Sequence, residues 1–263
     1  RAPNARQLIK QLPLYWGDQP FTSGPTYAGS IVIFLFILGL FFVKSEVRIW
    51  LVLATILSII LAWGKNFMPL TDLFLDYFPG YNKFRAVSMI LVIAEFTIPL
   101  LGFIALNKFL FLASDTSENQ KKKPLQFAFY LTGGFTLLFA LMPSLFFDFV
   151  GGQDASLEKN GWPIDALQSD RAALLSSDSW RSFIFISLTF GTLLMFLKNK
   201  LKSQYVVLIV GLLILVDMWT INKRYLNDDN FLRKSKVETP YQPTQANLQI
   251  LKDKDPNFRV FNQ

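Results

Sequence analysis

Two cations lie in an aromatic segment just before one of the long apolar runs of the chain. Lys83 and Arg85 follow a Pro79–Gly80 turn and Tyr81, with one phenylalanine between them. In an extended stretch, positions 83 and 85 project to the same side. An ammonium and a guanidinium that converge in this way suit a single phosphate group, which the guanidinium contacts through two N–H bonds. The alternative is that both cations only reach lipid headgroups, as long basic side chains do at membrane surfaces.

A second polar and aromatic cluster lies near the start of the chain. Trp16 offers a flat ring, and Asp18 and Gln19 add a carboxylate and an amide two and three positions later. Such a set suits a sugar, because the polar groups bind hydroxyls while the ring packs against the apolar face of the sugar. The alternative is an aromatic anchor at the membrane interface, followed by a turn.

Two carboxylates fall inside apolar runs, where a charge is costly. Glu95 lies about ten residues into its run, near the bilayer centre, so we expect it to be protonated or paired and to face the protein interior or a polar cavity. It is either a substrate-binding residue or a buried structural hydrogen-bonding group. Asp217 lies nearer the end of its run, where we expect it to reach water. Asp178 and Arg181 have the spacing of a local ion pair on a helix.

The composition excludes several kinds of chemistry. The chain has no Cys and no His, which removes thiol nucleophiles, imidazole acid–base catalysis and the usual zinc sites. Catalysis would rest on Asp, Glu, Lys, Arg or Tyr; we expect no bound metal or other cofactor, although a divalent cation held by carboxylates stays open. The net charge of +7 does not indicate nucleic acid, because much of the excess lies in short loops between apolar runs.

Six long apolar runs must position these groups. About 20 apolar residues in a helix cross a hydrocarbon core of about 30 Å, and every run meets or approaches that length without a clear polar stripe. The sequence therefore predicts an all-α polytopic membrane protein with six transmembrane helices. The runs cover residues 27–43, 47–64, 86–112, 125–150, 180–197 and 205–221.

The gaps between the runs predict the orientation. Three short gaps are basic, as cytoplasmic loops are; they contain Lys44 and Arg48, Lys108 with Lys121, Lys122 and Lys123, and Lys198, Lys200 and Lys202. The other gaps, residues 65–85 and 151–179, are longer and mix charge signs. We therefore expect residues 1–26, both long gaps and the tail from residue 222 to lie outside the cytoplasm.

Shorter elements are predicted around the runs. Residues 1–12 and 164–177 each have the pattern of an amphipathic helix that lies flat on the membrane. Pro99 is expected to kink the third run. Residues 223–263 read as the start of a soluble α+β domain, with a helix capped by Thr244 and a strand at 258–261. Both ends of the chain read as cut, so we expect a piece of a longer polypeptide.

Four separated stretches carry a resemblance to a known family. They are residues 15–24 (YWGDQPFTSG), 78–89 (FPGYNKFRAVSM), 222–231 (NKRYLNDDNF) and 250–261 (ILKDKDPNFRVF). Together they resemble the bacterial YfhO-type membrane protein family, which is similar to polytopic glycosyltransferases of the C superfamily. The resemblance implies a multi-pass protein of the bacterial cytoplasmic (inner) membrane and a polyprenyl-phosphate-linked sugar as donor. It also implies modification of a cell-envelope polymer, such as a teichoic acid, on the extracytoplasmic face.

The resemblance leaves catalysis open. The acidic catalytic motif of that superfamily usually lies in the first extracytoplasmic loop, which would precede Arg1, so no residue here is assigned as catalytic. The alternative function is a non-catalytic membrane scaffold or assembly factor that binds a partner membrane complex. An acidic pair upstream of Arg1 would favour the enzyme, and its absence would favour the scaffold.

Overall fold

The computed structural model describes residues 14–17, 26–83, 86–112, 118–232, 234, 237 and 244–252. Every regular element within these residues is helical. The chain divides into two units, residues 1–221 and 222–263, and each is described by itself. The helices of the first unit are α2 (Ser30–Phe42), α3 (Glu46–Ala62), α4 (Met68–Tyr77), α5 (Leu91–Asn107), α6 (Glu118–Leu141), α7 (Asp154–Lys159), α8 (Ile164–Leu197) and α9 (Ser203–Tyr225), the last of which runs into the second unit.

The long helices identify a membrane-embedded protein. Within the described residues, four segments are long and apolar enough to cross a bilayer: Val87–Phe111, Gln120–Leu141, Ile164–Leu197 and Ser203–Tyr225. A fifth is present if Glu46–Ala62 and Gly64–Tyr77, which meet at 110°, count as one broken span. The prediction of six spans is not met. The first predicted run forms only the 13 residues of α2, about 20 Å of helix against a core of about 30 Å.

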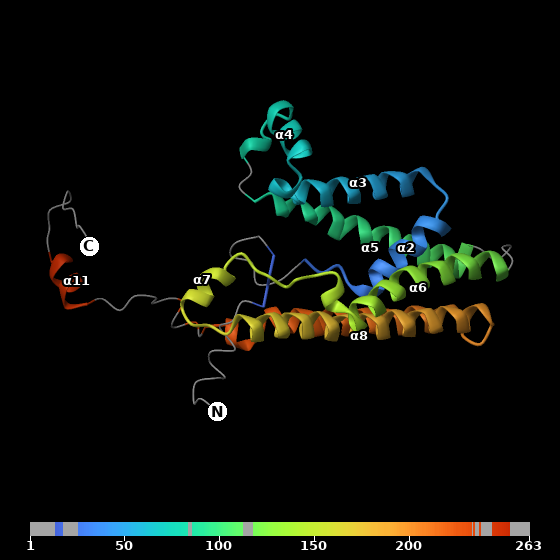
Figure 1. Ribbon diagram of the computed structural model, residues 1–263. Coiled ribbons are helices and arrows are strands. Elements are labelled where there is room, and N and C mark those ends of the chain that lie inside the picture. The colour runs from blue at the N-terminus through green and yellow to red at the C-terminus, as the bar shows by residue number, and fades with distance from the viewer. Residues whose placement is uncertain are drawn as a thin grey trace. The chain divides into compact units, whose positions relative to one another are not determined.

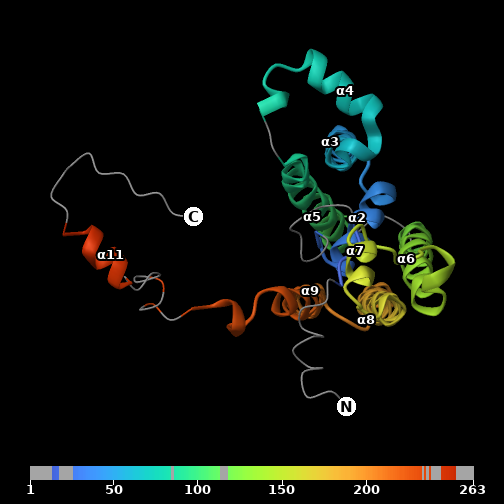
Figure 2. The same cartoon turned by 60° about the vertical axis from the view of Figure 1, so that its left-hand side comes forward.

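The short helix α2 lies at the centre of the bundle. It packs against α5, α6 and α8, and Figure 2 shows it among these helices in a view close to their axes. Ile31, Phe34, Leu35 and Leu38 are fully buried. Because α2 meets protein on several sides, its sequence needs no polar stripe, although it is too short to span the bilayer.

Two glycines allow α2 and α5 to approach closely. A methyl group added at Gly102 of α5 would lie 3.3 Å from the backbone nitrogen of Phe36 and 3.3 Å from the backbone oxygen of Val32. One added at Gly39 of α2 would lie 2.9 Å from Cγ of Leu101. Small residues at such contacts let helix backbones meet in a membrane.

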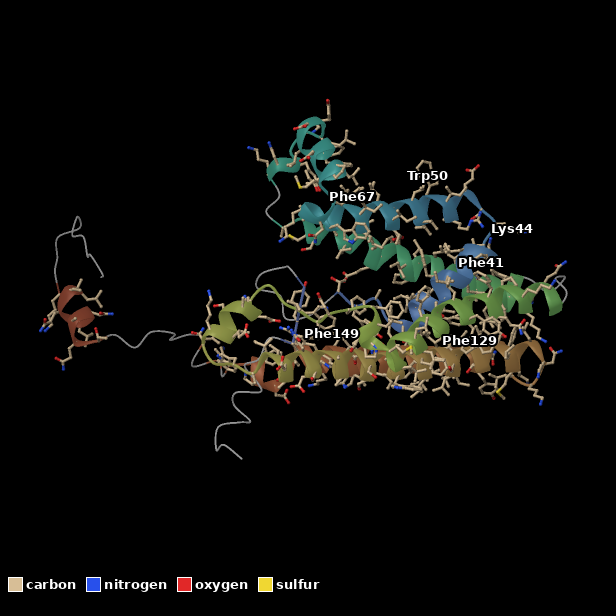
Figure 3. The ribbon with its side chains drawn as sticks, in the orientation of Figure 1. Phe41, Lys44, Trp50, Phe67, Phe129 and Phe149 are labelled. Atoms are coloured by element: carbon tan, nitrogen blue, oxygen red, sulfur yellow. The ribbon has the colours of Figure 1, made fainter. Side chains whose placement is uncertain are left out.

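The three basic connections lie at one end of the first unit, which we call the basic end. Figure 1 shows the C-terminal ends of α2, α5 and α8 on the same side. Lys44, labelled in Figure 3, marks the turn from α2 to α3, and residues 198–202 join α8 to α9. The bend from α3 to α4 and the connection from α6 to α8 lie at the opposite end.

Two predicted boundaries were wrong. Residues 164–177 do not form a separate flat helix; they are the first part of the 34-residue helix α8, which is about 51 Å long and outreaches a hydrocarbon core of about 30 Å. The fourth run was predicted to reach residue 150, but α6 ends at Leu141, because Pro143 follows and disfavours the helical conformation at Met142 before it. Pro99 lies inside α5, and the kink expected there stays a prediction.

The second unit is described only in part. Among its described residues, η6 (Asp228–Asn230) and α11 (Gln245–Ile250) are helical, so the predicted α+β character is not shown. The predicted cap is confirmed, since Oγ1 of Thr244 accepts a hydrogen bond from the backbone N–H of Asn247 at 3.3 Å. The predicted strand at 258–261 and the predicted helix at 1–12 lie outside the described residues.

Candidate functional site

The segment that carries Lys83 follows an aromatic cluster at the end of α4. The rings of Phe74 and Phe78 stack with centroids 5.4 Å apart, and Tyr81 packs on Phe74 at 5.5 Å. Gly80, with a φ of +82°, turns the chain, and its carbonyl accepts a hydrogen bond from the Lys83 N–H at 3.0 Å. We call Phe74, Phe78 and Tyr81 the α4 aromatic cluster.

Lys83 is exposed beside this cluster, in the short helical turn η2 (Tyr81–Lys83). The prediction of an extended stretch at 83–85 is therefore not met at Lys83 itself. Arg85, the second predicted cation, lies outside the described residues. The hydroxyl of Tyr81 is buried and has no hydrogen-bond partner within the described residues.

Trp16 belongs to a different part of the unit. Its ring meets the ring of Phe149 edge-on, with centroids 5.2 Å apart. Asp18 and Gln19, predicted to act with Trp16, lie outside the described residues. Within the described part of the chain, no ring contact or hydrogen bond joins Trp16 to Tyr81 or Lys83, so the two predicted clusters are not brought together by direct contact.

A buried ion pair supports the contact that Trp16 makes. Nη1 and Nη2 of Arg171 lie 2.7 and 2.9 Å from the two carboxylate oxygens of Asp154, and Arg171 is 1% exposed. The same guanidinium donates a hydrogen bond to the backbone oxygen of Phe149 at 2.8 Å. Phe149 has a φ of +58°, a left-handed conformation that a bulky residue seldom adopts. Arg171 thus holds the connection between α6 and α7, in which Figure 3 labels Phe149, against α8.

The pair also changes the acidity of its carboxyl group. Burial by itself raises the pKa of Asp154, but hydrogen bonds from Arg171 and from the Gly151 N–H, with the positive charge of Arg171, outweigh it. The pKa of Asp154 is therefore held below its ordinary value. The sequence analysis missed this pair. Its signal was weak, since two opposite charges 17 residues apart in a mixed loop have many other arrangements.

A second polar cluster ties three helices together inside the bundle. Asp217 of α9 is 1% exposed, and one of its carboxylate oxygens lies 2.8 Å from Nη1 of Arg181 on α8. The other oxygen accepts hydrogen bonds from the backbone N–H and the hydroxyl of Ser30, each at 2.9 Å. The hydroxyl of Tyr27 donates to the same carboxylate at 2.8 Å. We call Tyr27, Ser30, Arg181 and Asp217 the α2 anchor.

The α2 anchor corrects one prediction and extends another. Asp217 does not reach water, because α2 and α8 cover it on the inner side of α9. The predicted pair of Asp178 and Arg181 is confirmed, with Nε of Arg181 3.8 Å from the carboxylate, and Arg181 makes a closer contact of 2.8 Å with Asp217 on another helix. Helical spacing predicted the pair of Asp178 and Arg181. It could not predict Asp217, which is 36 residues away on another helix.

Glu95 does not lie where the sequence predicted. It was expected to face the protein interior, yet its side chain is exposed on α5. It makes no hydrogen bond or ion pair with any described residue. Residues one position before it and two positions after it, Ala94 and Thr97, are buried instead. The correction follows from packing, because α5 turns its small residues toward α2 and α3, and this places Glu95 on another side of the helix.

The described residues contain no group of three or more acidic side chains that would hold a metal ion. The described polar features singled out above are an exposed cation beside aromatic rings and two buried ion pairs. No family model, curated protein or solved structure matches this chain.

Proposed function

We propose that the protein transfers a sugar from a polyprenyl-phosphate-linked donor to a cell-envelope polymer, and that the segment after α4 binds the donor phosphate. The observation that supports this role is Lys83, an exposed cation beside the α4 aromatic cluster. The resemblance of four sequence stretches to the YfhO-type family supplies the substrate class. No residue of the chain is assigned as the catalytic acid or base in this proposal.

Physical chemistry favours a phosphate at this place. Tyrosine side chains such as Tyr81 are enriched at the boundary between hydrocarbon and water, which is also the level of a lipid phosphate. Helix α4 leaves α3 at an angle of 110°, which suits a helix that runs along the membrane surface. An ammonium held there meets a lipid phosphate without first crossing the hydrocarbon core.

The orientation belongs to the same proposal. We place the protein in the cytoplasmic membrane of a bacterium, with the basic end in the cytoplasm and the end that carries α4 and α7 outside. Short basic connections are retained on the cytoplasmic side during insertion. The donor phosphate would then be bound on the extracytoplasmic face.

Phosphate binding is tested with the 263-residue chain in lipid nanodiscs. Binding of polyprenyl phosphate, measured by native mass spectrometry, should weaken about two- to fivefold in Lys83→Gln, the range expected for one exposed charge contact. Lys83→Arg should keep binding. Lys159→Gln is the matched control, because Lys159 is also an exposed lysine in a connection at the same end.

The outcomes separate the two functions. Loss in Lys83→Gln but not in Lys159→Gln supports a donor site. Equal binding by all variants, or no binding above that of a lipid without phosphate, rejects it. A chain that binds no polyprenyl phosphate but copurifies with one defined membrane complex would instead be a scaffold.

A further inference from the structure

The face of α5 that carries Glu95 has a feature that the proposed donor site does not explain. Glu95 lies eight residues after Val87, the first residue of a 25-residue candidate span. At a rise of about 1.5 Å per residue, its Cα is about 12 Å into that span and about 6 Å from its midpoint. A carboxylate at this depth is within the hydrocarbon core.

The surroundings of Glu95 on α5 are apolar and uncovered. Val92 and Phe96, which lie beside it on the helix surface, are 63% and 67% exposed, and Ile93 is 42% exposed. The side of α5 that carries Ala94, Thr97 and Leu101 is filled, since α5 packs there against α2 and α3. If lipid covered this face, an acid would stand against acyl chains without a hydrogen-bond partner, which is costly in any protonation state.

The same bundle shows how an acid inside a span is accommodated. Asp217 receives a guanidinium from a neighbouring helix, with Nη1 of Arg181 at 2.8 Å. Glu95, which is exposed on α5, receives no such group from the described residues. The missing element is a helix that brings a cation to the same depth.

We propose that the Glu95 face of α5 binds a membrane-spanning helix of a partner, apolar along its length and carrying one arginine or lysine at the depth of Glu95. Among these 263 residues, the segments outside the described ones are each shorter than the about 20 residues that a span requires. A second copy of the chain offers no suitable group either, because Arg171 and Arg181 are engaged by Asp154 and Asp217, and the other cations of the described spans lie within a few residues of a span end. Charge complementarity therefore selects a different helix.

This surface is independent of the donor site. Glu95 and Lys83 make no contact with each other within the described residues, and each is altered separately by substitution. A failure of the phosphate-binding test on Lys83 would not affect the helix-binding proposal, and a failure of the helix-binding test on Glu95 would not affect the proposed donor site.

The test uses synthetic helices as defined probes. Fluorescently labelled poly-leucine peptides of about 20 residues carry a single Arg, Gln, Glu or Leu at the central depth. The labelled 263-residue chain is reconstituted in phosphatidylcholine vesicles, and association is followed by energy transfer as peptide is added. The Arg peptide is expected to bind roughly threefold to thirtyfold tighter than the Leu peptide, the range of one interhelical hydrogen-bonded contact.

Variants of α5 decide whether Glu95 carries this preference. Glu95→Gln and Glu95→Leu should bring the Arg peptide to the affinity of the Leu peptide. Phe103→Gln is the matched control, because Phe103 is an exposed residue farther along α5, and it should leave the Arg preference unchanged. Melting of each variant in detergent shows that the fold is intact, which we expect because Glu95 supports no described contact.

Several results would overturn the proposal. Equal binding of the Arg and Leu peptides would mean that lipid covers this face. If the Gln peptide bound as tightly as the Arg peptide, both to the wild type and to Glu95→Gln, a neutral hydrogen bond and not charge would set the preference. Energy transfer between two differently labelled copies of the chain that disappears in Glu95→Leu would identify the occupant as a second copy.

Discussion

The carboxylate of Asp217 lies 2.9 Å from the backbone nitrogen of Ser30, the first residue of α2, although the two residues are 187 positions apart. The N-terminal N–H groups of a helix have no partner within the helix, and the helix dipole favours a negative charge there. The residue before α2 is a glycine without a capping side chain. Asp217 therefore caps α2 from another helix, while Arg181 balances its charge.

We expect Asp217→Ala to destabilise the protein by about 3–5 kcal/mol, because it leaves Arg181 and the start of α2 without their buried partner. Asp217→Asn should cost less, since the amide oxygen still accepts hydrogen bonds from Ser30. Unfolding in detergent, followed by circular dichroism, measures both effects. Asp72→Asn serves as control, because Asp72 is exposed and should change little. An Asp217→Ala protein that unfolds at the wild-type midpoint would show that the α2 anchor contributes no net stability.

The glycine contact between α2 and α5 makes a second prediction. Gly102→Ala places a methyl group 3.2 Å from Cβ of Leu35 and against the backbone of α2, so overpacking should cost about 1–3 kcal/mol. Gly191→Ala in α8 is the matched control, since nothing lies within 4 Å of the added methyl group. Alanine favours helix more than glycine, so this control should be neutral or stabilising. The two midpoints are compared in the same detergent, and similar shifts for both variants would argue against a close helix crossing.

The sequence predicted the helical class and the basic connections, because apolar length and Lys/Arg placement are local signals. It overestimated α2, whose apolar residues are explained by burial among other helices rather than by a full crossing. It also divided α8 at Ser177, where polarity changes but the backbone remains helical. The hydrophobicity of a segment indicates whether lipid, protein or water surrounds it. It does not indicate where a helix begins or ends.

The site predictions show the same division. Lys83 is exposed near aromatic rings, as its position before a long run indicated. By contrast, Asp217 binds side chains at least 36 positions away, and Arg171 binds one 17 positions away. Helical spacing does not indicate either set of partners. The side of α5 on which Glu95 lies depends on where the small residues pack, so a single sequence does not determine it.

The lowered pKa of Asp154 predicts an acid-sensitive loop. A carboxyl group whose pKa is depressed by folding contributes stability that is present above its unfolded pKa, about 3.9, and is lost as the pH falls through the folded value. Asp154→Asn lacks this titration. The difference in unfolding free energy between the wild type and Asp154→Asn should thus stay constant from pH 7 to about 5 and shrink below about pH 4. A difference that already narrows near pH 6 would mean that the pKa is raised.

The orientation makes the last prediction, and the chain suits its measurement because it has no native cysteine. Single cysteines at Lys44, Lys122 and Lys200 probe the basic end, and those at Asp72, Lys159 and Lys252 probe the segments expected outside. In intact cells, with any outer membrane made permeable, a membrane-impermeant maleimide should label the second set. The first set should react only after lysis, since its connections carry the positive charges that hold loops in the cytoplasm. Labelling at position 122 before lysis, with none at position 159, would invert the topology and place Lys83 on the cytoplasmic face, where the proposed extracytoplasmic transfer is impossible.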